Sequence, residues 1–227
     1  MSGQYHVDLE QFSIKEFQHI LETGRLLPSE RVLGEKTCER FAILAAMGIT
    51  NLQGLAHRLK SKKKLEQFAQ ESGIPQDYLT ILRRRIGVYV PKPVPLIKFP
   101  GVDPEHVERL AAVGIKQTEQ LFERAQSAQD RAALSDLTGV PDDALLELVK
   151  LSDLSRASYV GPTFARVIYE AGADTIGKLA DCSPEELCAN LRAVNEEQGL
   201  TKAAMPSVED ITACVEIWKK LPRVIEY

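Results

Sequence analysis

The chain has 227 residues, of which 44% are hydrophobic, 26% are charged and 6% are aromatic, and its formal net charge is −4. No apolar run approaches the ~18 residues of a membrane-spanning helix, and the first residues lack the charged and apolar regions of a secretory signal. We therefore exclude a membrane protein and expect a mainly helical, cytoplasmic protein with four reduced cysteines that hold no metal, Cys38, Cys182, Cys188 and Cys214.

An N-terminal helical arm is expected over residues 1–30. Its apolar side chains follow helical spacing: Phe12, Ile14, Phe17, Ile20 and Leu21. Ser13 can cap this helix together with Glu16 three positions on, which is the capping-box pattern. Gly24 is expected to end the helix.

A first helical unit is expected over residues 31–90. Its predicted helices are one that follows Thr37 and ends at Gly48, one over Leu52–Lys60, one over Lys63–Ser72, and one that opens at Pro75 and runs to Arg85. Pro75 suits the first turn of a helix, because the N–H that proline lacks has no helical partner there. Three alternating prolines follow within Val88–Pro95, so this segment is expected to be a stiff, extended linker.

The second unit is expected over residues 91–151, which include the proline linker, and the third over residues 152–227. Ser183 and Pro184 predict a helix start, with the serine as the cap and the proline at the first helical position. Trp218 lies on the last amphipathic helix and is expected in the core.

The first two units are copies of one repeat at an offset of 66 residues. Gly48-Ile49 recurs as Gly114-Ile115, and Gly73-Ile74-Pro75 recurs as Gly139-Val140-Pro141. Apolar positions between these anchors match as well. An internal repeat predicts the same order of helices in both copies. The third unit has its turn glycine at Gly172 and then departs from this register.

Charge is distributed unevenly along the chain. Residues 1–100 carry 15 Lys+Arg against 10 Asp+Glu, whereas residues 101–227 carry 13 against 22. Binding to phosphates depends on clustered charge rather than on the overall isoelectric point. The basic residues of the first unit that we assign to nucleic-acid contacts are Lys36, Arg58, Lys60, Lys62, Lys63, Lys64, Arg83, Arg84 and Arg85. The alternative is a solvated basic face.

Phe99–Ile115 contains a glycine-bearing hairpin, a helical segment and a Gly-Ile turn, and Tyr159–Gly172 and Thr175–Leu187 repeat parts of this pattern. These segments resemble the helix-hairpin-helix motif. Tandem units of this kind resemble an uncharacterised bacterial family, the domain of unknown function 4332, over nearly the whole chain outside the arm. The resemblance implies an all-α fold of tandem helix-hairpin-helix (SAM-like) units after the N-terminal helical arm.

In that motif the hairpin glycines let the backbone approach a phosphate, and the N–H groups of the following helix bind it without reading bases. The third unit keeps Gly161 at the second glycine position, and Thr163 and Arg166 could add a hydroxyl and a charge. The second unit instead has Asp103 at this position, followed by Glu105, and carboxylates repel a phosphate. We assign a phosphate contact to the third hairpin; the alternative is that Gly161 merely permits the turn and Arg166 is solvated. For the second hairpin we expect a purely structural role.

The sequence contains no Walker loop, dinucleotide-binding glycine fingerprint or metalloprotease motif, and its four histidines form no recognisable triad. We therefore expect no enzymatic activity, no cofactor and no small-molecule substrate. Two functions remain open. The first is binding to the backbone of duplex DNA without sequence preference. The second is a protein–protein adapter that kept the fold and lost its phosphate sites.

Overall fold

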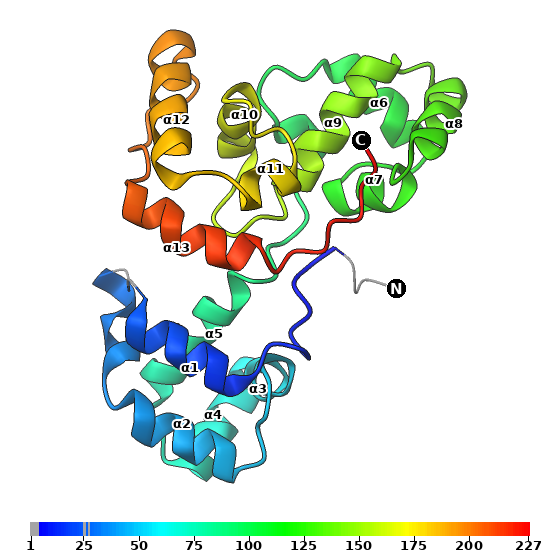
Figure 1. Cartoon of the computed structure of the whole chain (residues 1–227). Helices are drawn as coiled ribbons and strands as arrows, with labels where there is room; N and C mark the ends of the chain where they lie inside the picture. Colours follow the sequence, from blue (N-terminus) through cyan, green and yellow to red (C-terminus); the bar gives the residue numbers. More distant parts are fainter. Residues whose placement is uncertain (1–4, 25, 27) are drawn as a thin grey trace. The chain divides into compact units, whose positions relative to one another are not determined.

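The computed structural model describes residues 5–24, 26 and 28–227, and these residues form helices and turns with two isolated β-bridges and no strand (Figure 1). The fold is therefore all-α, as predicted. The chain divides into two compact units, one of Val7–Val90 and one of Tyr5, His6 and Pro91–Tyr227. Among the described helices, none combines the length and the apolar character that crossing a membrane requires.

The Val7–Val90 unit is built on an aromatic core. Its helices are α1 (Ile14–Thr23), the 3-10 helix η1 (Pro28–Gly34), α2 (Thr37–Ala46), α3 (Leu52–Leu59), α4 (Lys62–Ser72) and α5 (Gln76–Gly87). Helix α1 lies against α2, and α5 lies against α3 and α4. The rings of Phe12, Phe17 and Tyr89 pack edge to face between them. The predicted arm helix is thus packed into the core of this unit.

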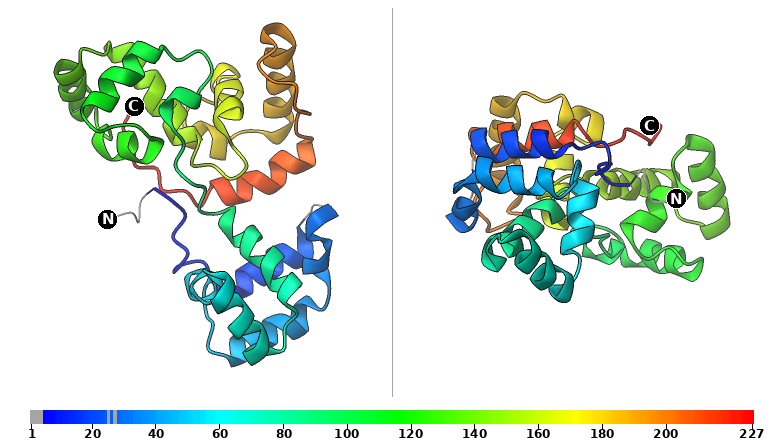
Figure 2. Two further views of the ribbon diagram at one scale, coloured as in Figure 1. Left: turned by 180° about the vertical axis from the view of Figure 1, so that it is seen from behind. Right: turned by 90° about the horizontal axis from the view of Figure 1, so that it is seen from below.

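The unit that contains Pro91–Tyr227 holds the second and third sets of helices. These are the 3-10 helix η2 (Leu96–Lys98), α6 (Pro104–Ala112), α7 (Thr118–Arg124), α8 (Ala128–Thr138), α9 (Asp142–Leu154), α10 (Pro162–Glu170), α11 (Ile176–Ala180), α12 (Pro184–Gln198) and α13 (Val208–Trp218). Helix α9 lies against α7, α8 and α10 and so joins the two sets, while α13 lies against α11 and α12 (Figures 1 and 2). Trp218 is buried, as predicted.

The repeat predicted the helix order correctly. Helices α2–α5 and α6–α9 follow one another in the same order, and α3, α4 and α5 each begin 66 residues before α7, α8 and α9. The turn glycines have positive φ angles, at 78° for Gly48, 89° for Gly114 and 87° for Gly172. In each turn the next N–H bonds to a carbonyl five residues back in the preceding helix. Glycine is required in these turns because other residues are strained in the left-handed region.

Several helix ends agree with the sequence, and others differ by one or two residues. Ser13 and Ser183 cap α1 and α12, and Pro184 is in the first turn of α12. Thr37, however, is the first residue inside α2 rather than its cap. Pro75 is the cap of α5 and not its first helical residue, because its ψ of 138° is extended. Proline fixes φ but leaves ψ free, so it suits either position.

Candidate nucleic-acid interface

The predicted basic residues of Arg58–Lys64 lie together where α3 ends and α4 begins, and we call this segment the basic corner. Lys60, Lys62 and Lys63 are exposed, with 86% of the Lys62 side chain accessible. Lys62 is only loosely paired, with its Nζ 3.9 Å from Glu66 Oε1. Such an exposed pair contributes little stability. The corner therefore presents flexible ammonium groups to the solvent.

The two remaining basic side chains of the corner have closer partners. Arg58 Nη2 lies 2.5 Å from Glu71 Oε2, and its guanidinium covers the buried ring of Phe68 at 4.8 Å. Lys64 Nζ lies 3.3 Å from His57 Nε2, so this ammonium faces a ring nitrogen and not a carboxylate. Arg58 has a packing role at the edge of the corner, and Lys64 pairs with no carboxylate among the described residues.

The first turn of α4 carries charge of the unfavourable sign. It holds Lys62, Lys63 and Lys64 and no acidic residue. A helix N-terminus carries partial positive charge from its unpaired N–H groups, so lysines there are unfavourable and anions are favourable. A local arrangement that costs stability without a structural gain indicates a functional site.

A comparison with the other hydroxyl-capped helices places this turn in context. Helix α11, capped by Thr175, also has a lysine at the third position, Lys178. Helices α1, α4, α8, α12 and α13 all begin after a serine whose hydroxyl accepts a backbone N–H three positions on. The residues that donate this N–H are Glu16, Lys64, Asp130, Glu186 and Asp210. Four of the five are acidic, and among these serine-capped helices only α4 has a lysine.

The equivalent corner of the second copy shows what is missing from the first. There the Asp130 carboxylate accepts from the Ser127 N–H at 3.0 Å and from the Ser127 hydroxyl at 2.7 Å. These bonds lower the pKa of Asp130. The C-terminal segment also contacts this corner, where the Glu226 N–H donates to the Gln126 carbonyl at 2.8 Å. Lys64 stands at the position of Asp130, so the first copy leaves its donors open to an external anion.

The three arginines at the end of α5 do not form one basic face. Arg84 is exposed and Arg83 is half-buried. Arg85 is buried and lies 3.4 Å from the Glu30 carboxylate. The assignment of Arg85 to a phosphate contact is therefore corrected, since its guanidinium faces the core and is already neutralised.

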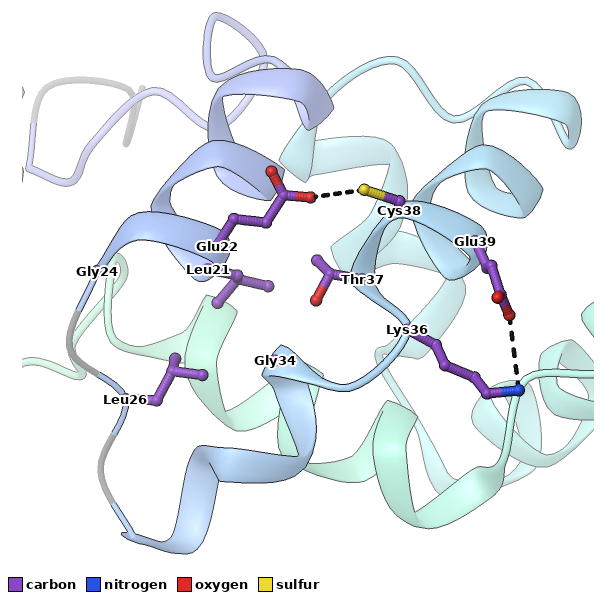
Figure 3. Close-up of a pocket in the computed structure, with 9 residues that line it drawn as sticks. All are labelled: Leu21, Glu22, Gly24, Leu26, Gly34, Lys36, Thr37, Cys38 and Glu39. Atoms are coloured by element: carbon purple, nitrogen blue, oxygen red, sulfur yellow. Dashed lines mark hydrogen bonds and ion pairs between the residues drawn. The ribbon is translucent and has the colours of Figure 1, made fainter.

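Lys36 lies at a pocket of about 520 Å³ beside the start of α2 (Figure 3). It caps α2 in a left-handed conformation, at φ 49°, and its Nζ lies 3.7 Å from Glu39. The Cys38 thiol donates to Glu22 at 3.2 Å, and this carboxylate raises the pKa of the thiol. Two carboxylates against one ammonium make the pocket acidic, so it is unsuited to a phosphate.

The third hairpin does not supply the predicted charge. The guanidinium of Arg166 is buried, pairs with Glu147 and with Glu170 at 3.1 Å, and donates to the Pro100 carbonyl at 2.8 Å. A Cβ on Gly101 would lie 3.7 Å from Arg166 Nη2. The assignment of Arg166 to a phosphate contact is corrected, because this side chain fastens the hairpin of the second copy to α10 of the third.

The other two residues of this hairpin remain accessible. Gly161 caps α10 with an ordinary φ of −81°, and a Cβ there would contact nothing within 4 Å. Thr163 lies in the first turn and is half-buried. Tyr159 occupies the left-handed position of the hairpin at φ 66°, and its side chain is 48% exposed. The hairpin is open to solvent, but it has lost the charge that would hold a phosphate.

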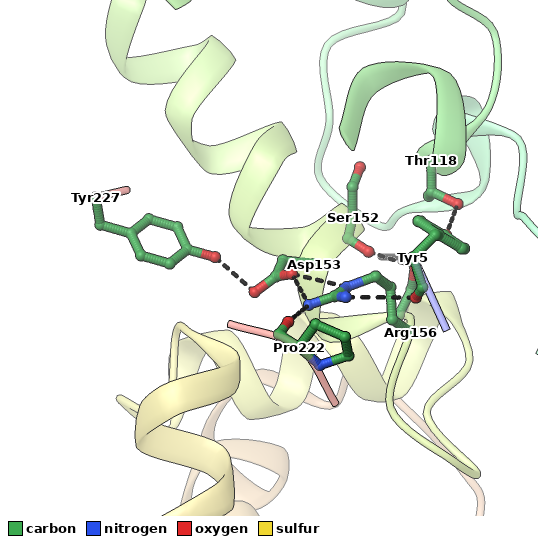
Figure 4. Close-up of polar contacts among 8 residues, drawn as sticks. Tyr5, Thr118, Ser152, Asp153, Arg156, Pro222 and Tyr227 are labelled. Atoms are coloured by element: carbon green, nitrogen blue, oxygen red, sulfur yellow. Dashed lines mark hydrogen bonds and ion pairs between the residues drawn. The ribbon is translucent and has the colours of Figure 1, made fainter. Parts of the chain in front are cut away.

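The sequence offered Arg156 as a possible phosphate neighbour of the third hairpin, but the structure buries it in a polar cluster (Figure 4). Its guanidinium has no exposed surface and lies 2.6 Å from Asp153 Oδ1. It also donates to the carbonyls of Tyr5 at 3.3 Å and Pro222 at 2.9 Å, and it stacks over Phe122 at 4.4 Å. Backbone acceptors leave no mark in a sequence, so only the aspartate three residues earlier could have indicated this cluster.

The remaining candidate groups are thiols and potential metal ligands. The four cysteines carry free thiols, as predicted. Within residues 5–24, 26 and 28–227, no three His, Cys, Asp or Glu side chains are grouped so as to hold a metal ion. The basic corner is therefore the strongest candidate site.

These observations define a helical repeat protein with one lysine-rich corner. Residues 100–221 match the model of the family described as Domain of unknown function (DUF4332). This segment is more than half of the chain, and the chain belongs to that family. No curated protein and no solved structure matches it significantly. The basic corner and the whole Val7–Val90 unit lie outside the matched segment.

Proposed function

We propose that this protein is a non-enzymatic nucleic-acid-binding protein that grips the phosphate backbone of duplex DNA without sequence preference. The proposed scaffold is a series of tandem helix-hairpin-helix units, and the proposed contact is the basic corner. The observation that carries the proposal is the lysine-rich first turn of α4. Lys64 replaces the acidic residue that four other serine-capped helices have at this position.

A phosphate at the basic corner would relieve the unfavourable charge of the helix start. Its oxygens could accept from the N–H and the hydroxyl of Ser61, as the Asp130 carboxylate accepts from Ser127 at the equivalent corner. The first N–H groups of α4 could donate to it as well. The ammonium groups of Lys60, Lys62 and Lys63 would follow the backbone on either side. Lysines act as point charges on phosphates and carry no base recognition, which supports binding without sequence preference.

Duplex DNA is favoured over single strands because the corner, as far as the structure describes it, exposes no Phe, Tyr or Trp ring. Phe68, the aromatic side chain in contact with Arg58, is only 1% exposed. Binding of single strands depends on aromatic side chains on which bases stack. A rigid duplex requires only correctly spaced charge.

A protein–protein adapter is the second candidate, and it is favoured by the acidic part of the chain. Residues 101–227 carry 13 Lys+Arg against 22 Asp+Glu. The hairpin of the second copy is fastened by Arg166, which is therefore occupied inside the protein. In the adapter hypothesis these units bind a protein partner, and the basic corner is a solvated face.

The test is a comparison of affinities for a fluorescent 20-base-pair duplex and the matching single strand in low salt. We expect the duplex to bind more tightly, and the triple variant Lys62→Ala, Lys63→Ala, Lys64→Ala to lose at least about tenfold in affinity for it. The matched control is Lys15→Ala, Lys92→Ala, Lys202→Ala, which removes the same charge from exposed sites elsewhere. Equal losses in both triple variants, or no binding by the unmodified chain, would favour the adapter.

A further inference from the structure

Ser61 lies at the centre of the basic corner and is exposed. Arg58 and Lys60 precede it, and Lys62–Lys64 follow it. Its hydroxyl accepts the Lys64 N–H at 3.3 Å. Among the contacts of the described residues, this hydroxyl donates no hydrogen bond of its own. Ser61 therefore combines an accessible oxygen with basic neighbours on both sides in the sequence.

Three of the other four serine caps, all except Ser13, keep the hydroxyl proton engaged with an acid. Ser127 donates to Asp130 at 2.7 Å, Ser183 donates to Glu185 at 3.1 Å, and Ser207 donates to Asp210 at 2.9 Å. A phosphoryl group on any of these three would be forced against a carboxylate. The same group on Ser61 would meet lysines and the N-terminus of a helix, which is a favourable position for it.

We propose that Ser61 is a phosphorylation site for a protein kinase that selects serines flanked by basic residues, and that its phosphate closes the basic corner to nucleic acid. This inference rests on the proposed function. In the reaction, Ser61 Oγ attacks the γ-phosphorus of ATP and forms the new O–P bond. The bond from that phosphorus to the β,γ-bridging oxygen breaks, ADP leaves, and the hydroxyl proton passes to a carboxylate base of the kinase.

The attached phosphate would act as an internal competitor for the site. It carries about −1.5 to −2 charge near neutral pH and three acceptor oxygens. Lys62, Lys63 and Lys64 are close to it in the sequence and flexible enough to reach it. The interactions that hold a DNA phosphate at the corner would then be satisfied within the chain, and the remaining charge would repel the duplex.

The experiment uses the full chain and has Ser127 as its matched control, since both serines cap the same helix of the repeat. A basic-residue-directed kinase with ATP should label Ser61 at least about tenfold faster than Ser127, as site mapping by mass spectrometry measures. Phosphoserine is then encoded at position 61 or 127. In ³¹P NMR titrations, the second phosphate pKa should be lower at position 61 by about half a unit or more. Duplex affinity should fall at least about tenfold for position 61 only.

Equal labelling of the two serines, equal phosphate pKa values, or unchanged duplex affinity with phosphoserine at position 61 would each overturn the inference. Failure of the proposed function looks different. In that case the unmodified chain binds no duplex. The part of the inference in which the Ser61 phosphate blocks DNA binding is then wrong as well. The labelling rate and the ³¹P titration still test whether Ser61 is phosphorylated and whether the lysines interact with its phosphate. Neither measurement depends on nucleic acid.

Discussion

Basic side chains in this protein divide into two groups by what surrounds them. Arg85, Arg156 and Arg166 are buried and bonded to carboxylates or backbone carbonyls. Lys60, Lys62 and Lys63 are exposed. The planar guanidinium has five fixed donors and suits several acceptors at once, whereas an ammonium group on a long stem suits a mobile partner. Burial thus separates structural arginines from candidate phosphate contacts.

Part of this division can be read from the sequence. Arg85 lies three residues after Leu82 and next to Ile86, both of which are buried on α5. The helical period therefore places Arg85 on the core face and Arg84 outside it. Arg166 could not be placed in this way, because its partners Pro100 and Glu147 come from distant parts of the chain. Its burial depends on tertiary packing.

Replacement of Arg166 by alanine tests its structural role. The change removes two ion pairs and the hydrogen bond to Pro100. We expect the free energy of unfolding to fall by about 1.5–3 kcal/mol, the range for hydrogen bonds to charged groups. Urea denaturation measures this loss. Arg223→Ala is the control, because its pair with Asp181 is exposed, and the change should be much smaller. Equal losses would place Arg166 among the solvated residues.

His6 is expected to make stability depend on pH. Burial, and then the Arg156 guanidinium, lower the pKa of this imidazole below its usual value of 6.5. The unfolded chain then binds a proton more readily than the folded chain, so stability decreases as pH falls below about 6.5. Urea midpoints between pH 8 and pH 5.5 should show this decrease, and His6→Asn should flatten it. A decrease of the same size in the variant would assign it to other groups.

At the scale of helices, the sequence predicted best those helix ends that depend on the chemistry of one or two neighbouring residues. The glycine anchors predicted the turns that end α2 and α6, because their φ angles of 78° and 89° exclude most other residues. The serine caps of α1 and α12 were predicted for a similar reason. Thr37 and Pro75 were each misplaced by one residue, since both residue types are compatible with a cap and with the first turn.

Lys64→Asp restores the acidic residue that four serine-capped helices have. The new carboxylate could accept from Ser61, as Asp130 accepts from Ser127. We expect α4 to gain about 1 kcal/mol of stability, since favourable charge at a helix end replaces unfavourable charge. Thermal unfolding measures the gain, and duplex binding should weaken in the same variant. A variant that is less stable than the parent would show that Lys64 does not destabilise the start of α4. The charge at this helix end would then be no sign of a functional site.

At the scale of the whole chain, the main feature that the sequence did not predict is the Arg156 cluster. It joins Tyr5 and Pro222, which are distant from Arg156 along the chain. Both acceptors are backbone carbonyls, and the sequence carries no signal for them. Tyr5 and Pro222 also lie outside residues 100–221, the segment that matches the family. This cluster therefore extends the structural unit beyond the family match.

Deletion of residues 222–227 tests whether this extension is needed. The deletion removes the Pro222 acceptor of Arg156 and the Tyr227 hydroxyl that donates to Asp153 at 2.7 Å. A buried donor left unsatisfied costs about 1–3 kcal/mol, and we expect at least that loss in urea denaturation. Tyr227→Phe removes only the hydroxyl and should lose less. Equal stability of the deletion variant and the full chain would show that the terminal segment is not part of the fold.

The central claim is that the lysines of the basic corner contact phosphates, and its most direct test is the salt dependence of duplex binding. For duplex DNA, log K falls with log salt at a slope of about −0.9 for each phosphate neutralised. The variant Lys62→Ala, Lys63→Ala, Lys64→Ala should flatten that slope by up to about 3 units, and Lys15→Ala, Lys92→Ala, Lys202→Ala should leave it unchanged. An unchanged slope with intact binding in the first variant would contradict the account.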